Sequence, residues 1–191
     1  FAPIGMHPIV EFDPAGTLTA GNSSPLTDGA AGLWVADEAG MARLGREPAV
    51  RLVDWQIAAM DFRHSDEGIL MAPARAIPQL LARHQLRFAE IASWNIHEAF
   101  AAQVLANIAA ASDPVYRREK AGVDFDLGAL DWSRVNPHGG SLALGHPFAA
   151  TGARILSQAA KEMATLPSGS YGVVSLCADG GQGTVALLQR V

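Results

Sequence analysis

Residues 136–152 read Asn-Pro-His-Gly-Gly-Ser-Leu-Ala-Leu-Gly-His-Pro-Phe-Ala-Ala-Thr-Gly, so a glycine pair and an apolar run precede Gly145-His146-Pro147. A helical pattern follows directly. Proline suits the first position of a helix, because the N–H that it lacks has no partner there in any case. The sequence therefore predicts that His146 lies at a helix N-terminus, where free N–H groups favour developing negative charge. An imidazole at such a place is a candidate acid–base catalyst.

Working outward from this stretch, apolar runs alternate with helical spacings along the chain. Runs rich in β-branched and apolar residues predict strands over residues 5–12, 50–60, 91–96, 171–176 and 184–188. Helical spacing predicts helices over residues 73–84, 98–110 and 153–166, and a further one from Ser24-Pro25 towards Gly40. Residues 113–132 are polar and turn-rich, as is typical of a surface excursion. The alternation predicts an α/β layered domain.

Three side chains capable of chemistry follow predicted strand ends or precede predicted helix starts. His97 lies between the strand ending at residue 96 and the next helix, and Cys177 follows the strand over residues 171–176. His146 is the third. Such ends converge on one face of a layered α/β fold, and binding sites are built there. Because the reference pKa of a thiol is about 8.5, a modest lowering by a neighbour would let Cys177 act as acid or base.

Four segments together carry a family resemblance. Residues 97–103 read His-Glu-Ala-Phe-Ala-Ala-Gln, residues 177–183 read Cys-Ala-Asp-Gly-Gly-Gln-Gly, and Thr19-Ala20-Gly21-Asn22-Ser23-Ser24 precedes Asp28-Gly29-Ala30-Ala31. With the Gly145-His146-Pro147 stretch, these segments closely resemble the ordered motifs of the C-terminal half of the thiolases. The resemblance covers nearly the whole chain. It implies a single unit over residues 1–191: an α-β-α layered domain with a mixed sheet, helices on both faces and a buried helix.

The resemblance implies roles for six residues in reversible Claisen chemistry on a 3-ketoacyl-CoA. Cys177 resembles the cysteine that protonates the departing enolate, and His146 resembles the histidine that activates a nucleophilic cysteine. His97 stands where many thiolases carry Asn, and it would help to hold the thioester oxygen. The substrate-binding residues implied are Phe100 at the pocket floor, and Gly145 and Gly181, whose backbone would lie close to the acyl group.

Two departures from the family pattern stand out. Cys177 is the only cysteine, so the nucleophile, the N-terminal domain and the CoA-binding loop region of the family are expected to be absent from this chain. The chain alone is therefore expected not to turn over. Asp179 stands where the family usually has Gly or Ala, and its carboxylate would either crowd the site or point into solvent. The motif His-Glu-Ala-Phe-Ala-Ala-Gln most resembles the thiolase subunit of fatty-acid β-oxidation complexes.

Composition limits the kinds of partner. The 191 residues carry a net charge of −5 and only 14 Lys and Arg, which argues against a nucleic-acid binder. No apolar run reaches the length of a membrane span. No short pair of metal ligands occurs, so no metal is expected, and no cofactor is expected beyond coenzyme A as a substrate.

We expect acyl-CoA, an N-terminal thiolase half and further copies of the chain as partners, with a β-oxidation multienzyme subunit as another candidate. A cytoplasmic location is expected, or a mitochondrial one in a eukaryote. The first residue is Phe rather than Met, so a targeting segment could precede it.

Ordinary structural explanations stand beside these assignments. A histidine before a helix is commonly a capping or hydrogen-bonding residue, and a lone cysteine is commonly a small core side chain. Glu98 is expected to be structural, while His138 has no assigned role. Residues 180–183 lack the following helix that a nucleotide loop requires. Three functions stay open: degradative 3-ketoacyl-CoA thiolase, biosynthetic acetoacetyl-CoA thiolase, and a catalytically silent thiolase-like binding or assembly domain.

Overall fold

A four-stranded mixed sheet forms the centre of the molecule in this computed structural model, which describes residues 16–64 and 66–191. The strand order is β1-β4-β3-β2, with β2 and β3 parallel and the other neighbours antiparallel. The strands are β1 (Val50–Ala59), β2 (Ile91–Ile96), β3 (Tyr171–Ala178) and β4 (Gln182–Arg190). All four confirm predicted strands. The predicted strand over residues 5–12 lies outside the described residues.

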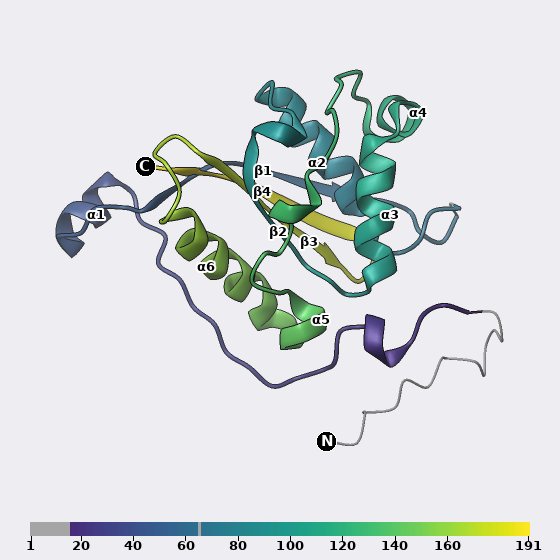
Figure 1. The fold of residues 1–191 in the computed structure, drawn as a ribbon, viewed down its shortest axis with the longest axis horizontal. Coiled ribbons are helices and arrows are strands. Elements are labelled where there is room, and N and C mark those ends of the chain that lie inside the picture. The colour runs from purple at the N-terminus through teal and green to yellow at the C-terminus, as the bar shows by residue number, and fades with distance from the viewer. Residues whose placement is uncertain (1–15, 65) are drawn as a thin grey trace.

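Helices cover both faces of this sheet, which confirms the layered α/β prediction (Figure 1). Helix α2 (Ala72–Arg83) packs on β1 and β4, and α3 (Ala101–Ser112) packs on α2. Helix α6 (Thr151–Met163) packs on β2 and β3 from the opposite face. Since α2 lies between the sheet and α3, it is the buried helix of the fold.

The core follows from the apolar stripes of these helices. Ile77, Leu80 and Leu81 on α2 are fully buried beneath the sheet, together with Trp94 of β2. A second, smaller cluster forms where Ile155, Ala159 and Met163 of α6 meet β3 and β4. Such stripes, spaced three or four residues apart, are what hold an amphipathic helix to a sheet. The two clusters fix the sheet edge at which His97 and Cys177 lie.

Short elements connect the larger ones. They are the 3-10 turns Ala20–Asn22, Phe88–Glu90, Trp132–Arg134 and Phe148–Ala150, α4 (Pro114–Tyr116), a π-helical turn over Arg117–Ala121, and α5 (Ser141–Leu144). The predicted surface excursion over residues 113–132 is largely exposed, but Leu127 is fully buried in the main core. This leucine ties the excursion to the domain.

The predicted helix from Ser24-Pro25 towards Gly40 is wrong. Residues 27–37 carry no regular structure, and α1 is limited to Glu38–Leu44, with Asp37 capping its first turn. Short helices gain most of their stability from burying an apolar face. Every residue from 25 to 39 is exposed, so no such gain is available here. Residues 23–37 instead run as an extended strap past α5 and α6 to reach α1 (Figure 1).

One part of the sheet is left uncovered. Trp55 and Ile57 alternate along β1 on the face opposite α2, and they are 58% and 60% exposed. Trp34 and Val35 in the strap are 90% and 75% exposed. Large apolar patches on a surface usually mark an interaction site. Among the described residues, no helix is both long enough and apolar enough to cross a bilayer.

Candidate active site

His97 is placed by the end of strand β2. Its backbone N–H donates to the carbonyl of Ser175 in β3 at 2.8 Å, and the side chain is almost completely buried. Nδ1 of His97 lies 2.9 Å from Oγ of Ser141 at the start of α5. Burial, followed by the positive charges of His146 and Arg154, lowers the pKa of His97 to about 4. The imidazole is therefore neutral at physiological pH.

His146 is held between the strap and the start of α6. Its N–H donates to the carbonyl of Pro25 at 2.9 Å, and its Nδ1 lies 2.8 Å from Oγ1 of the buried Thr151. Burial, and then the charge of Arg154, lower the pKa of this half-buried imidazole. The predicted placement of Pro147 in the first turn of a helix is wrong. A 3-10 turn over Phe148–Ala150 intervenes, because α6 begins only at Thr151.

The fold brings the two imidazoles into contact. The ring centroids of His97 and His146 are 4.3 Å apart and the rings are tilted by 44°. The ring of Phe148 lies 4.7 Å from His146 on the solvent side and is 64% exposed. Two histidines 49 positions apart in the chain thus form one unit.

Cys177 lies at the same end of the sheet, as the penultimate residue of β3. Ser175 of β3 pairs with Ile96, so Cys177 and His97 both follow one paired position on neighbouring parallel strands. Its thiol is buried, and burial raises the pKa of Cys177 to about 11. A modest lowering of this pKa by a neighbour is, from the sequence, only a condition for Cys177 to act as acid or base, and the net shift in the structure is upward. Within residues 16–64 and 66–191, no hydrogen bond joins this thiol to either imidazole.

The structure gives each of the three predicted substrate-binding residues a defined backbone environment, and their roles in binding substrate stay predictions. Phe100 precedes α3 and its backbone forms an isolated bridge with Ser23 of the strap. Gly145 has φ +98°, and a Cβ there would collide with the side chain of Thr27. Gly181 has φ +74°, and a Cβ there would lie 2.5 Å from the carbonyl oxygen of Met60. Both conformations favour glycine.

Sequence reasoning missed the polar residues that support the histidines. Asn136 has φ +46°, and its side chain accepts from the N–H of Ile96 at 2.8 Å and donates to the carbonyl of Ile96 at 2.9 Å. Ser141 contacts His97, and Arg154 donates to Ser141 at 2.9 Å. Asn136 and Ser141 lie within the stretch 136–152, so the segment was recognised but these contacts were not. Only the tertiary fold brings Arg154 to Ser141.

Glu98 and Asp179 have separate local roles. The carboxylate of Glu98 accepts from the side chain of Asn136 and, at 3.1 Å, from the N–H of Leu142. This agrees with the structural role expected for Glu98. Asp179 is exposed, and its carboxylate accepts from the N–H of Gly180 at 2.7 Å. The carboxylate of Asp179 thus closes its own turn.

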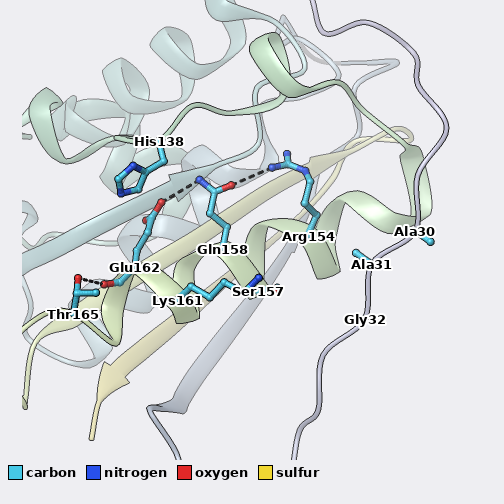
Figure 2. Close-up of a pocket in the computed structure, with 10 residues that line it drawn as sticks. All are labelled: Ala30, Ala31, Gly32, His138, Arg154, Ser157, Gln158, Lys161, Glu162 and Thr165. Carbon is cyan, nitrogen blue, oxygen red and sulfur yellow. Dashed lines mark hydrogen bonds between the residues drawn. The ribbon is translucent and has the colours of Figure 1, made fainter.

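A groove of about 600 Å³ runs between the strap and α6 (Figure 2). His138, Arg154, Gln158 and Lys161 line it on one side, and residues 30–32 line it on the other. Neither His97, His146 nor Cys177 contributes to its walls, so the groove is distinct from the histidine pair. Among the described residues, no group of three His, Cys, Asp or Glu side chains is arranged to hold a metal ion.

Comparison with known proteins gives the family. The family described as "Thiolase, C-terminal domain" matches residues 46–190. The 3-ketoacyl-CoA thiolases of Shewanella amazonensis and Shigella flexneri are 40% and 41% identical over 174 residues, which are 91% of this chain and 39% of each relative. The chain thus spans about two fifths of the length of these relatives.

Solved structures of thiolases resemble the fold of this chain. The dimeric peroxisomal thiolase of Saccharomyces cerevisiae superposes with a TM-score of 0.72 at 34% identity, covering 94% of this chain and 39% of that one. A thiolase from Ascaris suum in complex with coenzyme A superposes with a TM-score of 0.69 at 30% identity, covering 94% and 41%. With the paired histidines and Cys177 at one sheet edge, these matches show that the chain belongs to the thiolase family.

Proposed function

We propose that this chain supplies the acid–base half of a 3-ketoacyl-CoA thiolase that degrades fatty acids by β-oxidation. The observation that carries the proposal is the contact between the rings of His97 and His146, whose centroids are 4.3 Å apart, at the same end of the sheet as Cys177 near the end of β3. The relatives named 3-ketoacyl-CoA thiolase support the same reaction.

In the proposed reaction, His146 takes the proton of a cysteine thiol that lies outside this chain. That thiolate attacks the keto carbon of the 3-ketoacyl-CoA, and the bond between C2 and C3 breaks. The electron pair of this bond becomes the enolate of acetyl-CoA, which Cys177 protonates at C2. The acyl group stays on the nucleophilic cysteine until the thiol of a second coenzyme A takes it. The proton held by His146 then returns to Cys177, and the proton of the second coenzyme A thiol passes through His146 to the nucleophilic cysteine as the acyl group leaves it, which restores the starting state.

The burial of Cys177 suits its proposed role as proton donor to the enolate. With its pKa raised to about 11, the thiol is protonated at neutral pH and ready to donate. An enolate carbon is far more basic than a thiolate of this pKa, so the transfer runs downhill. The same thiol would remove the proton in the condensing direction, so its pKa does not select a direction. Degradation is favoured over a biosynthetic acetoacetyl-CoA thiolase by the relatives named 3-ketoacyl-CoA thiolase.

The neutral state of His97 suits an oxyanion hole. Because its pKa is lowered to about 4, the imidazole carries one ring N–H that can donate to an oxygen. Donors fixed in place before the reaction stabilise charge that develops on a thioester oxygen. Phe100, Gly145 and Gly181 would form the surrounding surface for the acyl group.

The remainder of the active site would come from an N-terminal portion that carries the nucleophile and the CoA-binding loops. Trp55 and Ile57 of β1, and separately Trp34 of the strap, are exposed apolar side chains that such a portion would cover. A dimer or larger assembly follows the dimeric relative, and a β-oxidation multienzyme subunit is a further proposed partner. A cytoplasmic or, in a eukaryote, mitochondrial location fits this pathway.

A silent binding or assembly domain is the second candidate, because Cys177 is the only cysteine. The two proposals differ in one assay. The native protein is isolated, its intact mass and associated polypeptides are measured, and thiolysis of 3-ketoacyl-CoA substrates is followed by loss of the keto-thioester. Our proposal predicts no thiolysis by the 191-residue chain alone, and thiolysis once a polypeptide with the nucleophilic cysteine is present. An assembled protein without thiolysis would support the silent domain.

A further inference from the structure

We propose that Ser141 and Arg154 are positioning residues that hold His97 as the neutral imidazole with its hydrogen on Nε2. This inference rests on the proposed function, because His97 would then present a fixed N–H donor to the thioester oxygen. It is argued from the geometry of His97, Ser141 and Arg154. The tautomer of His97 can be measured without any turnover.

The direction of the hydrogen bonds starts at Arg154. A guanidinium has only donors and stays protonated in proteins. Nη2 of Arg154 lies 2.9 Å from Oγ of Ser141, so the hydroxyl oxygen must accept in that contact. The single hydrogen of the hydroxyl is left to be donated elsewhere.

His97 is the acceptor that the structure offers to this hydrogen. Ser141 is completely buried, and its Oγ lies 2.9 Å from Nδ1 of His97. In the part of the chain that the structure describes, Oγ of Ser141 has no other acceptor. A buried hydroxyl hydrogen without an acceptor costs about 1–3 kcal/mol. Ser141 therefore donates to Nδ1, and the hydrogen of the neutral His97 ring lies on Nε2.

Arg154 is itself fixed by a row of side chains on α6, which Figure 2 shows. Its Nη1 donates to Oε1 of Gln158 at 3.3 Å, and Nε2 of Gln158 donates to Glu162 at 3.0 Å and to the carbonyl of Gly139 at 3.2 Å. Glu162 in turn accepts from Asn95 of β2 at 2.8 Å. The row holds the guanidinium at one place relative to β2, the strand that ends before His97.

The charges around His97 agree with a neutral ring. Burial has the largest effect and lowers the pKa of His97. His146 and Arg154 face the ring, and positive charge on them disfavours a positive charge on His97 and lowers its pKa further. Glu98 acts on Arg154, whose pKa it raises against the larger lowering by burial. No hydrogen bond in the described residues uses Nε2 of His97. This N–H is thus free for a substrate oxygen.

The test reads the tautomer directly. The 191-residue chain is labelled with ¹⁵N-histidine, and the two ring nitrogens of His97 are assigned by two-bond ¹H–¹⁵N correlation, with His97→Asn used to identify the signals. We expect the shift of an unprotonated nitrogen at Nδ1 and of a protonated nitrogen at Nε2. The same shifts are measurable in the solid state if the chain precipitates. The opposite assignment, or equal populations of both tautomers, would overturn the proposal.

Variants then identify the residues responsible. Ser141→Ala is expected to reduce the tautomer preference about fivefold or more, since one hydrogen bond is lost, and Arg154→Gln to reduce it less. Arg154→Lys, which keeps a charged donor, is expected to restore most of the preference. Ser157→Ala on the same helix is the matched control and is expected to change nothing. A Ser141→Ala spectrum identical to that of the parent chain would contradict the proposal.

The outcome is separable from that of the proposed function. A fixed Nε2–H tautomer in a chain whose full assembly never cleaves 3-ketoacyl-CoA would sustain the positioning role and refute the reaction. Thiolysis that survives Ser141→Ala with an unchanged pH profile would sustain the reaction and refute the positioning role.

Discussion

At the scale of the residue, the reactivity of Cys177 depends on the burial of its thiol. Burial raises its pKa to about 11, so the thiolate fraction at pH 7.5 is more than about 100-fold below that of a free cysteine. We predict that iodoacetamide alkylates the native chain at least about 100-fold more slowly than it alkylates the chain unfolded in urea. The rate should keep rising up to about pH 11. Because Cys177 is the only cysteine, mass spectrometry reads the reaction without ambiguity, and alkylation at the rate of the unfolded chain would show that the thiol is not protected.

His97 makes folding sensitive to acid. Its folded-state pKa of about 4 is below the unfolded value of about 6.5, so the unfolded chain binds the proton more tightly. Stability is therefore lost as the pH falls from about 6.5 to about 4, by at most about 3–4 kcal/mol from this residue. In His97→Asn, the free energy of unfolding measured in urea should depend less on pH over that range. The smaller pH dependence that remains comes from His146. His138→Asn, at an exposed site, is the control. An unchanged slope in His97→Asn would contradict the buried neutral state.

At the scale of elements, Asn136 joins the glycine-rich loop to β2. Its side chain makes two hydrogen bonds with the backbone of Ile96, one residue before His97, from a backbone with φ +46°. Asn136→Gly keeps the backbone conformation and removes these bonds, and we predict a loss of about 1–3 kcal/mol in the free energy of unfolding. Asn136→Ala should lose more, because Ala adopts positive φ poorly. Equal stability of the Gly variant and the parent chain in urea titrations would rule out this tie.

Gly183 lets α2 approach β4 beside Cys177. It pairs with Cys177 across the two strands, and a Cβ on it would lie 2.8 Å from the backbone nitrogen of Pro73. A backbone atom moves less readily than a side chain, so Gly183→Ala should destabilise the chain by about 1–3 kcal/mol. Gly169→Ala, with open space around it but a positive φ, is the comparison for backbone strain alone. A smaller loss in Gly183→Ala than in Gly169→Ala would contradict the close packing.

The elements differ in how far their sequences predict them. β1, α2 and α6 have alternating or helical burial patterns, and β2 is a short apolar run buried at nearly every position, so residue patterns place all four within a few residues. The helix expected from Ser24-Pro25 fails because its pattern needs a surface to pack on, and residues 25–39 are exposed. Likewise the motifs identify His97 and His146, but the contacts of Ser141 and Arg154 depend on how α5 and α6 meet β2. Such contacts between distant residues leave no periodic signal in one sequence.

At the scale of the whole molecule, the sheet is covered unevenly. α6 packs on β2 and β3, while Trp55 and Ile57 of β1 remain 58% and 60% exposed. We predict that an N-terminal portion covers this face. Trp55 and Trp34 emission should then shift to shorter wavelength in the assembled protein, and hydrogen exchange of β1 should slow. Trp132, 47% exposed in the 3-10 turn Trp132–Arg134, provides the comparison. Unchanged emission from single-tryptophan variants at positions 34 and 55 would place the partner elsewhere.

In our proposal, this chain supplies the acid–base residues and a second portion supplies the nucleophilic cysteine. This division is tested most directly by measuring the two half-reactions of the assembled protein separately. In the proposed mechanism, transfer of an acyl group from a simple acyl-CoA to the nucleophilic cysteine needs His146 but forms no enolate, whereas cleavage of a 3-ketoacyl-CoA needs Cys177 as well. We predict that Cys177→Ala lowers thiolysis by about 10²–10⁴-fold while acyl-enzyme still forms from acyl-CoA, as read by intact mass. His146→Ala should lower both. If Cys177→Ala cleaves 3-ketoacyl-CoA at the parent rate, the acid–base role of this chain is wrong.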